Sequence, residues 1–173
     1  YGPRNWNTTV YGVTPDYLLV RSWSLESGQP FTLTDVRRGT RVALLGQQVA
    51  RSLFGDQDPL NQTIRIKSLP FRVVGVLERK GQSLDGRDQD DIVMVPINTA
   101  QTKLFGNPFP GTVRFITVQA RSAELMEDAE ADIEQLLRGR HRLAKGVEND
   151  FTIRDLTAVA ETAAQSARAM TVM

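Results

Sequence analysis

Residues 81–105 read GQSLDGRDQDDIVMVPINTAQTKLF, and this stretch organises the predicted fold. Its first part is polar and acidic and contains two glycines. It leads into the apolar run Ile92–Val95, which is followed by Pro96 and by Asn98–Phe105, a segment of helical composition. A short continuous apolar run between turn signals is typical of a buried strand. The stretch therefore predicts a surface loop, a core strand and a helix in succession.

The chain before this loop carries further strand and helix patterns. Arg41–Leu45 predicts a strand, and an amphipathic helix pattern follows it and ends at Gly55. Thr63–Lys67 and Phe71–Leu77 alternate polar and apolar residues on either side of a short turn, which predicts a β-hairpin. These patterns together predict a compact block of strands and helices over residues 40–109.

The carboxyl-terminal part has a different pattern. Apolar and β-branched residues at 113–118 predict a strand, Ser122–Arg140 predicts a long amphipathic helix, and Phe151–Ile153 predicts another strand. Strand, helix and strand in succession indicate a βαβ unit with a right-handed crossover. Residues 156–173 place apolar side chains at helical spacing up to the last residue, so we expect a terminal helix that continues in a longer parent.

Composition excludes several classes of protein. A chain of 173 residues with 40% apolar residues can bury a core of its own. With 21 basic and 20 acidic residues, the chain lacks the strong positive field that drives nucleic-acid binding, so we expect no nucleic-acid partner. Because cysteine is absent, disulfides, thiol nucleophiles and thiolate zinc sites are excluded.

Residues suited to catalysis are scarce in the sequence. The single histidine, His141, is surrounded by arginines, which disfavour both its protonation and a bound cation. The sequence has neither a Gly-x-Ser-x-Gly elbow nor a glycine pattern for binding phosphate. We therefore predict a non-catalytic domain without a cofactor or a metal.

The acidic loop is the best local candidate for a contact surface. It is about as long as the structureless loops that usually carry a function. Its aspartates do not have the spacing of an EF-hand, so a loop that faces solvent or a partner is favoured and a calcium site remains the alternative. The candidate partner-binding residues are Asp85, Asp88, Gln89, Asp90 and Asp91 in the loop and Gln101 in the following helix.

An ordered series of short motifs covers nearly the whole chain. The series resembles the periplasmic domain of the MacB-type ABC transporter permeases, in the MacB/FtsX-like family. Besides the stretch quoted above, the motifs are Trp6-Asn7-Thr8-Thr9, Gly12-Val13-Thr14-Pro15-Asp16-Tyr17, Leu53-Phe54-Gly55, Phe71-Arg72-Val73-Val74-Gly75-Val76, Gly139-Arg140-His141 and Asp150-Phe151-Thr152.

This resemblance implies an α+β fold with α/β-type lobes. A porter-like βαβ lobe would be built from both chain ends, residues 1–39 and 110–173, and a smaller mixed α/β lobe, residues 40–109, would be inserted into it. The first helix and strand of the porter-like lobe would precede Tyr1.

The resemblance also implies a function in transport. The domain would be periplasmic, in a parent permease of the bacterial inner membrane, and would couple cytoplasmic ATP hydrolysis to efflux or export. The implied partners are a second protomer in a homodimer, a periplasmic membrane fusion protein, and an ATP-binding subunit or domain. Two alternatives remain open, namely the periplasmic domain of a lipoprotein-releasing permease and a ligand-binding or sensing domain.

Overall fold

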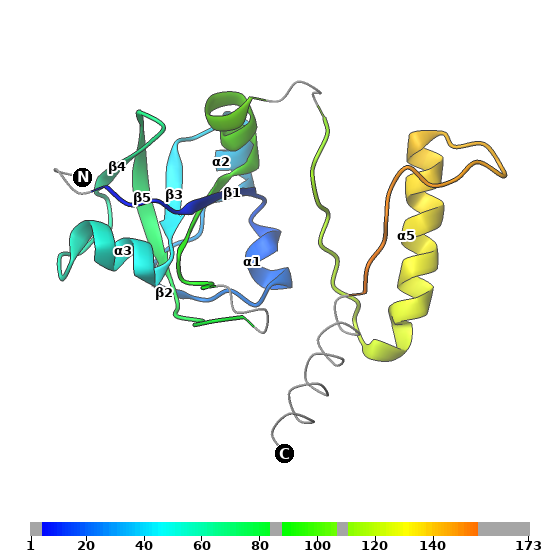
Figure 1. Cartoon of the computed structure of the whole chain (residues 1–173), viewed down its shortest axis with the longest axis horizontal. Helices are drawn as coiled ribbons and strands as arrows, with labels where there is room; N and C mark the ends of the chain where they lie inside the picture. The colour runs from blue at the N-terminus through cyan, green and yellow to red at the C-terminus, as the bar shows by residue number, and fades with distance from the viewer. Residues whose placement is uncertain (1–4, 84–87, 107–110, 156–173) are drawn as a thin grey trace, which may run out of the picture. The chain divides into compact units, whose positions relative to one another are not determined.

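The computed structural model describes residues 5–83, 88–106 and 111–155. The chain divides into two compact units, Tyr1–Thr117 and Val118–Met173. We call them the sheet unit and the helix unit and describe each by itself (Figure 1).

A mixed six-stranded sheet forms the framework of the sheet unit. Its strands lie in the order β1 (Thr9–Val13), β6 (Ile92–Pro96), β3 (Val42–Leu45), β5 (Leu69–Leu77) and β2 (Leu25–Gly28), while β4 (Thr63–Ile66) pairs with the first half of β5. The β1–β6 and β3–β5 pairs are parallel, and the other pairs are antiparallel. The α+β fold class predicted from the sequence is confirmed.

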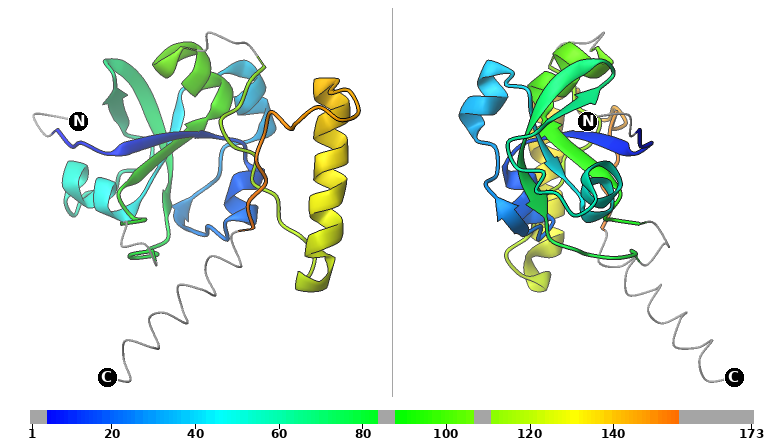
Figure 2. Two further views of the ribbon diagram at one scale, coloured as in Figure 1. Left: turned by 45° about the vertical axis from the view of Figure 1, so that its right-hand side comes forward. Right: turned by 90° about the vertical axis from the view of Figure 1, so that its left-hand side faces the viewer.

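Helices cover both faces of this sheet. The helices are α1 (Asp16–Val20), α2 (Leu33–Arg38), α3 (Gln47–Phe54) and α4 (Ile97–Thr99), which continues as a π-helix, η1 (Ala100–Phe105). Residues of α1 and α2 belong to one buried cluster, and residues of α3 and η1 belong to the other. Figure 2 shows α1 and α2 together on one side of the sheet.

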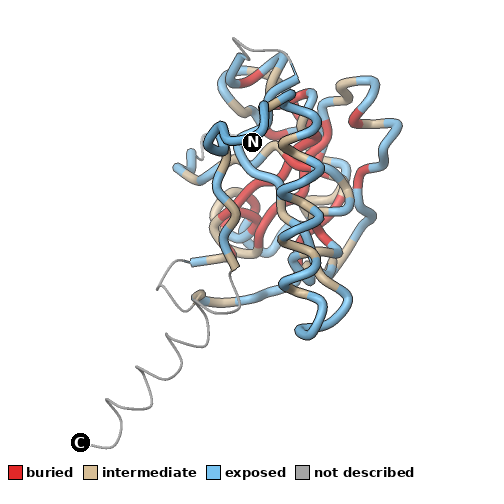
Figure 3. Tube along the Cα trace, turned by 90° about the vertical axis from the view of Figure 1, so that its right-hand side faces the viewer, coloured by how far each residue is buried: buried red, intermediate tan, exposed pale blue. Residues whose placement is uncertain are grey.

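The central strands are buried on both faces. Every residue of β3 and β6 is buried, and neighbours along a strand contribute to opposite clusters, as Leu44 and Leu45 do. A strand covered on both faces has a continuous apolar sequence, which explains why Ile92–Val95 lacks polar alternation. Figure 3 shows the buried residues gathered in the interior, with exposed residues around them.

Local signals explain where single elements begin and end. The Thr32 hydroxyl accepts a hydrogen bond from the Asp35 N–H, and the Asp35 carboxylate accepts one from the Thr32 N–H, so the two residues form a capping box at the start of α2. The hydrogen bond from the Thr32 backbone is the main reason why the pKa of Asp35 is lowered. Gly39, at φ 62°, ends the helix in the left-handed conformation.

The predicted β-hairpin is confirmed, with a tighter turn than expected. Lys67 and Ser68 both have positive φ angles, 48° and 68°, and Ile66 pairs with Leu69. Two turn residues with positive φ match the twist of the flanking strands. Strand β5 therefore begins at Leu69, before the residue at which the sequence pattern placed it.

The helix unit contains the predicted long helix, but neither of the strands predicted before and after this helix forms. The helix is α5 (Met126–His141), preceded by a 3-10 turn, η2 (Ala123–Leu125). Residues 113–118 and 151–153 form no strand in the described part of the chain, so the predicted βαβ unit is wrong for these residues. Phe115 is 80% exposed. The β-favouring side chains are present, but a strand also needs a neighbour that takes up its backbone N–H and C=O groups.

The boundary between the two units differs from the predicted boundary between the two lobes. The predicted lobes were residues 1–39 together with 110–173, and residues 40–109. Strands β1 and β2 come from the first of these ranges, yet β1 pairs with β6 over five residues and β2 pairs with β5. One sheet therefore includes strands from both predicted lobes. The predicted terminal helix, residues 156–173, lies outside the described residues.

No helix within residues 5–83, 88–106 and 111–155 combines the length and the apolar character needed to cross a membrane.

We predict that Leu44→Ala lowers the free energy of unfolding by about 2–5 kcal/mol, because it leaves a cavity in the centre of the core. Leu44 is fully buried, whereas Leu33 on α2 is 52% exposed. The matched change Leu33→Ala should cost less than about 0.5 kcal/mol. Urea denaturation followed by tryptophan fluorescence measures both values, and equal losses would contradict the assignment of Leu44 to the core.

Candidate partner-binding site

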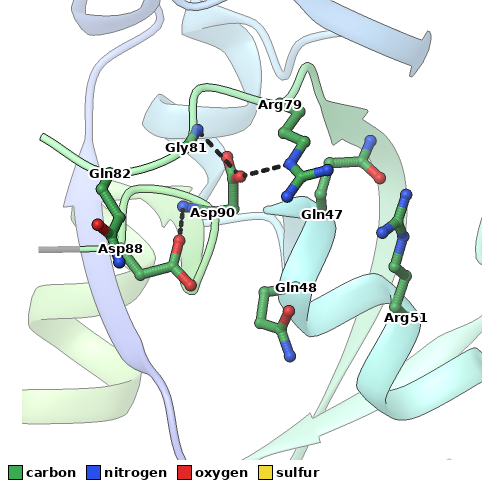
Figure 4. Close-up of a pocket in the computed structure, with 8 residues that line it drawn as sticks. All are labelled: Gln47, Gln48, Arg51, Arg79, Gly81, Gln82, Asp88 and Asp90. Atoms are coloured by element: carbon green, nitrogen blue, oxygen red, sulfur yellow. Dashed lines mark hydrogen bonds and ion pairs between the residues drawn. The ribbon is translucent and has the colours of Figure 1, made fainter.

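The loop between β5 and β6 is held together by Asp90. This residue is only 5% exposed, and its carboxylate accepts hydrogen bonds from the backbone N–H groups of Lys80, at 2.7 Å, and Gly81, at 3.0 Å. The Arg79 guanidinium lies 3.5 Å from the same carboxylate (Figure 4). Asp90 thus joins the two ends of the loop, and its side chain faces inward instead of toward a partner.

The backbone of Asp90 also fixes the first turn of α3. The Asp90 carbonyl accepts a hydrogen bond from the Gln48 N–H at 3.1 Å, and the Gly46 N–H donates to the Ile92 carbonyl at 2.8 Å. A Cβ atom at Gly46 would lie 2.2 Å from the Asp90 carbonyl oxygen. Glycine is therefore required at position 46, because only it lets the loop approach the helix this closely.

The other two aspartates that the structure describes in the loop also accept hydrogen bonds. The Asp88 carboxylate accepts from the Asp90 N–H at 2.8 Å, and the Gln89 N–H donates to the Gly81 carbonyl at 3.0 Å. The Asp91 carboxylate accepts from the Trp6 indole N–H at 2.8 Å. These bonds tie the loop to itself and to the segment before β1.

Of the two remaining predicted site residues, one lies outside the described part of the chain and the other lies on a different element. Asp85 lies outside the described residues. Gln101 lies on η1, where its amide donates to the Thr112 carbonyl at 2.9 Å. Gln101 comes after the carboxyl end of β6, whereas Asp88–Asp91 come before the amino end of the same strand. The two ends of a strand of this length are about 16 Å apart. The loop and η1 therefore do not form one continuous site.

A polar hollow lies between the loop and the start of α3. Its volume is about 280 Å³, and it is lined by Gln47, Gln48, Arg51, Arg79, Gly81, Gln82, Asp88 and Asp90 (Figure 4). Sequence reasoning found the two aspartates but missed the α3 residues and Arg79. The Gly46 junction was the available signal, since a glycine at a strand-to-helix step often marks a close approach of another segment.

The exposed charged side chains that line the hollow are two arginines, Arg51 and Arg79, and one aspartate, Asp88. Arg21 and Lys80 are also exposed but do not line it. The Lys80 ammonium donates to the Arg21 carbonyl at 2.6 Å and lies 4.5 Å from the centre of the Trp23 ring. Partial burial, followed by the nearby Arg21 charge, lowers the pKa of Lys80. The nearby acidic residue Glu26 is engaged by the Gln47 amide.

The described residues offer no metal centre. Among them, no group of three or more histidine or carboxylate side chains could hold an ion, which gives the calcium alternative no support. His141 is the last residue of α5, and its Nδ1 atom lies 2.7 Å from an Asp150 oxygen. The Arg138 guanidinium donates to the carbonyls of Ala144 and Val147, at 2.9 Å each. These contacts fold the segment after α5 back along the helix, so the role seen for His141 is structural.

We predict that Asp90→Asn loosens the loop and lowers the free energy of unfolding by about 1–3 kcal/mol, because an amide can accept at only one of its two positions and leaves a backbone N–H unpaired. Amide hydrogen exchange should accelerate at Lys80 and Gly81. The control Asp56→Asn changes an exposed aspartate by the same chemistry. Unchanged exchange at positions 80 and 81 would show that the carboxylate does not hold the loop.

The family comparison identifies the class of domain. A sequence model described as the MacB-like periplasmic core domain matches residues 1–136. The macrolide export ATP-binding/permease protein MacB of Chlorobium luteolum is 36% identical over 173 residues, which are 100% of this chain and 25% of that protein. The protein of the same name from Chlorobaculum tepidum is 40% identical over 157 residues, 91% of this chain and 24% of that protein. The chain thus spans about a quarter of the length of these relatives.

Solved structures show the same fold. The periplasmic region of MacB from Actinobacillus actinomycetemcomitans matches with a TM-score of 0.66 at 24% identity, over 88% of this chain and 64% of that chain. The extracellular domain of the ABC-type transporter YknZ from Gram-positive bacteria matches with a TM-score of 0.63 at 24% identity, over 86% of this chain and 74% of that chain.

Proposed function

Because the chain belongs to the family of MacB-like periplasmic core domains, we propose that it is the non-catalytic extracytoplasmic module of an ABC exporter permease. Its parent resides in the bacterial inner membrane, with this domain in the periplasm. The domain couples ATP hydrolysis on the cytoplasmic side to a movement that drives efflux or export. The observation that carries this proposal is the family match over residues 1–136, which includes the whole sheet unit.

The geometry of the sheet unit suits a module that transmits movement. Strands β3 and β6 are buried on both faces, and Asp90 bonds the loop before β6 to residues 79–81 and to α3. Close-packed interiors have low compressibility and transmit displacement. A push applied to the loop is therefore passed to the sheet instead of being absorbed by local bending.

In the proposed mechanism, an ATP-binding subunit or domain closes in the cytoplasm and the membrane part of the permease carries the displacement outward. The periplasmic domains of two protomers approach or separate. Their movement drives substrate into a conduit formed with a membrane fusion protein. The chain itself contributes a stiff body and a contact surface, and no chemical step.

The hollow itself does not have the usual character of a small-molecule site, so it gives the sensing alternative no support. At about 280 Å³ it is just below the size of about 300–1,000 Å³ usual for small-molecule sites, which are mostly apolar and enclosed. Its lining is instead polar and charged. A lipoprotein-releasing permease remains the second candidate, because the sheet unit would serve it equally well as a lever.

We predict that the cognate membrane fusion protein binds the full-length parent permease in nanodiscs, and that replacing residues 80–91 by a Gly/Ser linker weakens this binding at least about tenfold. Because the linker also removes Asp90, a second variant, Arg79→Glu, tests the same surface with the loop in place. The control is Ser68→Gly in the β4–β5 turn. If the fusion protein does not bind the intact parent, the lipoprotein-releasing alternative replaces this proposal.

We also predict that amide hydrogen exchange in the sheet unit differs between the nucleotide-free and the ATP-trapped parent. A domain that changes its contacts during the cycle gains or loses protection where those contacts form. The loop of residues 80–91 should show the largest change and the buried strand β3 the smallest. Equal protection in both states throughout the domain would contradict a role in transmitting movement.

A further inference from the structure

The charged side chains that line the hollow between α3 and the loop differ in how many hydrogen bonds and ion pairs they already make. The Asp90 carboxylate already receives two backbone N–H groups and the Arg79 guanidinium. One oxygen of Asp88 receives the Asp90 N–H. By contrast, the Arg51 guanidinium makes no hydrogen bond or ion pair with any residue in the described ranges. The groups left available to a ligand are therefore mainly donors.

Two arginines from different elements line the hollow. Arg51 comes from α3 and Arg79 from the loop that follows β5, and both line the same hollow. Figure 4 shows the side chains of Arg79, Gln47 and Arg51 on the same side of the hollow, with Gln82 and Asp88 on the other. The Arg79 side chain is 72% exposed, and among the described residues its one ion pair is the 3.5 Å contact to Asp90. The Arg79 guanidinium can thus donate to the carboxylate of a ligand while it stays close to the Asp90 carboxylate.

We propose that this hollow binds a carboxylate side chain from an acidic segment of a protein partner. Guanidinium groups pair with planar carboxylates through two parallel N–H donors, which fixes the position of the bound side chain. The inference rests on the proposed function in taking the partner to be a periplasmic protein engaged by the permease. The inference adds to the proposed function the kind of side chain that the partner contributes, a carboxylate.

Asp88 distinguishes a peptide from other anions. Its position opposite the arginines repels a doubly charged phosphate more strongly than a single carboxylate. Its second oxygen can accept a backbone N–H of the bound segment, and the Gln82 amide can bond to a peptide carbonyl. A recess between a loop and a helix also receives a projecting side chain better than a flat membrane surface.

The acidic residues of the loop do not by themselves make the hollow a site for a basic partner. The carboxylates of Asp90 and Asp91 accept hydrogen bonds from the N–H groups of Lys80, Gly81 and Trp6. Of the exposed charged side chains that line the hollow, Arg51 and Arg79 are positive and Asp88 is negative, and one Asp88 oxygen already accepts the Asp90 N–H. The partner segment is therefore acidic.

The test uses a capped hexaglutamate peptide as the probe and the isotope-labelled 173-residue chain as the target. Shifts in the amide spectrum should concentrate at residues 47–51 and 79–82 and weaken as salt is added. Arg51→Glu should weaken binding at least about tenfold, because an attraction becomes a repulsion. The control Arg65→Glu makes the same charge change at an exposed position of β4 outside the hollow, and should change binding less than about twofold.

Three results would overturn the proposal. Equal weakening by Arg51→Glu and Arg65→Glu would show attraction by overall charge alone. Binding of inorganic phosphate as tight as that of the peptide would show a general anion site. Vesicles of anionic lipid that bind through Arg51 when the peptide does not would show a membrane contact.

The outcome is separate from that of the proposed function. If the peptide binds through Arg51 and the fusion protein does not bind the parent, the proposed function fails and the chemistry of the hollow stands. If the fusion protein binds the parent and the peptide does not bind the chain, only this inference fails.

Discussion

The buried carboxylate of Asp90 is the constraint on which the candidate site depends. A carboxylate removed from water must be matched by donors, and here Lys80, Gly81 and Arg79 supply them. Because the same residue bonds to Gln48 through its carbonyl, the loop, the first turn of α3 and the start of β6 share one anchor. The polar hollow exists because these three segments are held at fixed separations.

The sequence predicted those elements that depend on neighbours along the chain. The β4–β5 hairpin, the buried strand at 92–95 and the long helix α5 have patterns that follow directly from their residues. The failures involve distant partners. Residues 113–118 and 151–153 have strand composition, but no described strand lies beside them, and composition does not record whether a neighbour is present. The pairing of β1 with β6 was missed for the same reason.

Sequence patterns were equally unable to predict which way the side chains of the candidate site point. The density of aspartates in the loop was visible, but the direction in which each one points depends on which backbone N–H groups lie nearby. Asp90 and Asp88 are two positions apart, yet Asp90 is buried and Asp88 is exposed. Arg51 and Gln47 belong to the site only because Gly46 allows α3 to approach the loop. No residue pattern within α3 itself indicates that this helix lies close to the loop.

The parallel pairing of β1 with β6 has a consequence for the order of folding. Thr8 and Asp91, which are bonded to each other at the start of this pair, are 83 positions apart in the chain. Closing so long a loop is entropically costly, and contacts of this kind form late. During synthesis, β1 emerges before the other five strands of this sheet and cannot pair with β6 until β6 has been made. The strand of this sheet that is translated before the others is therefore among the last to be stabilised.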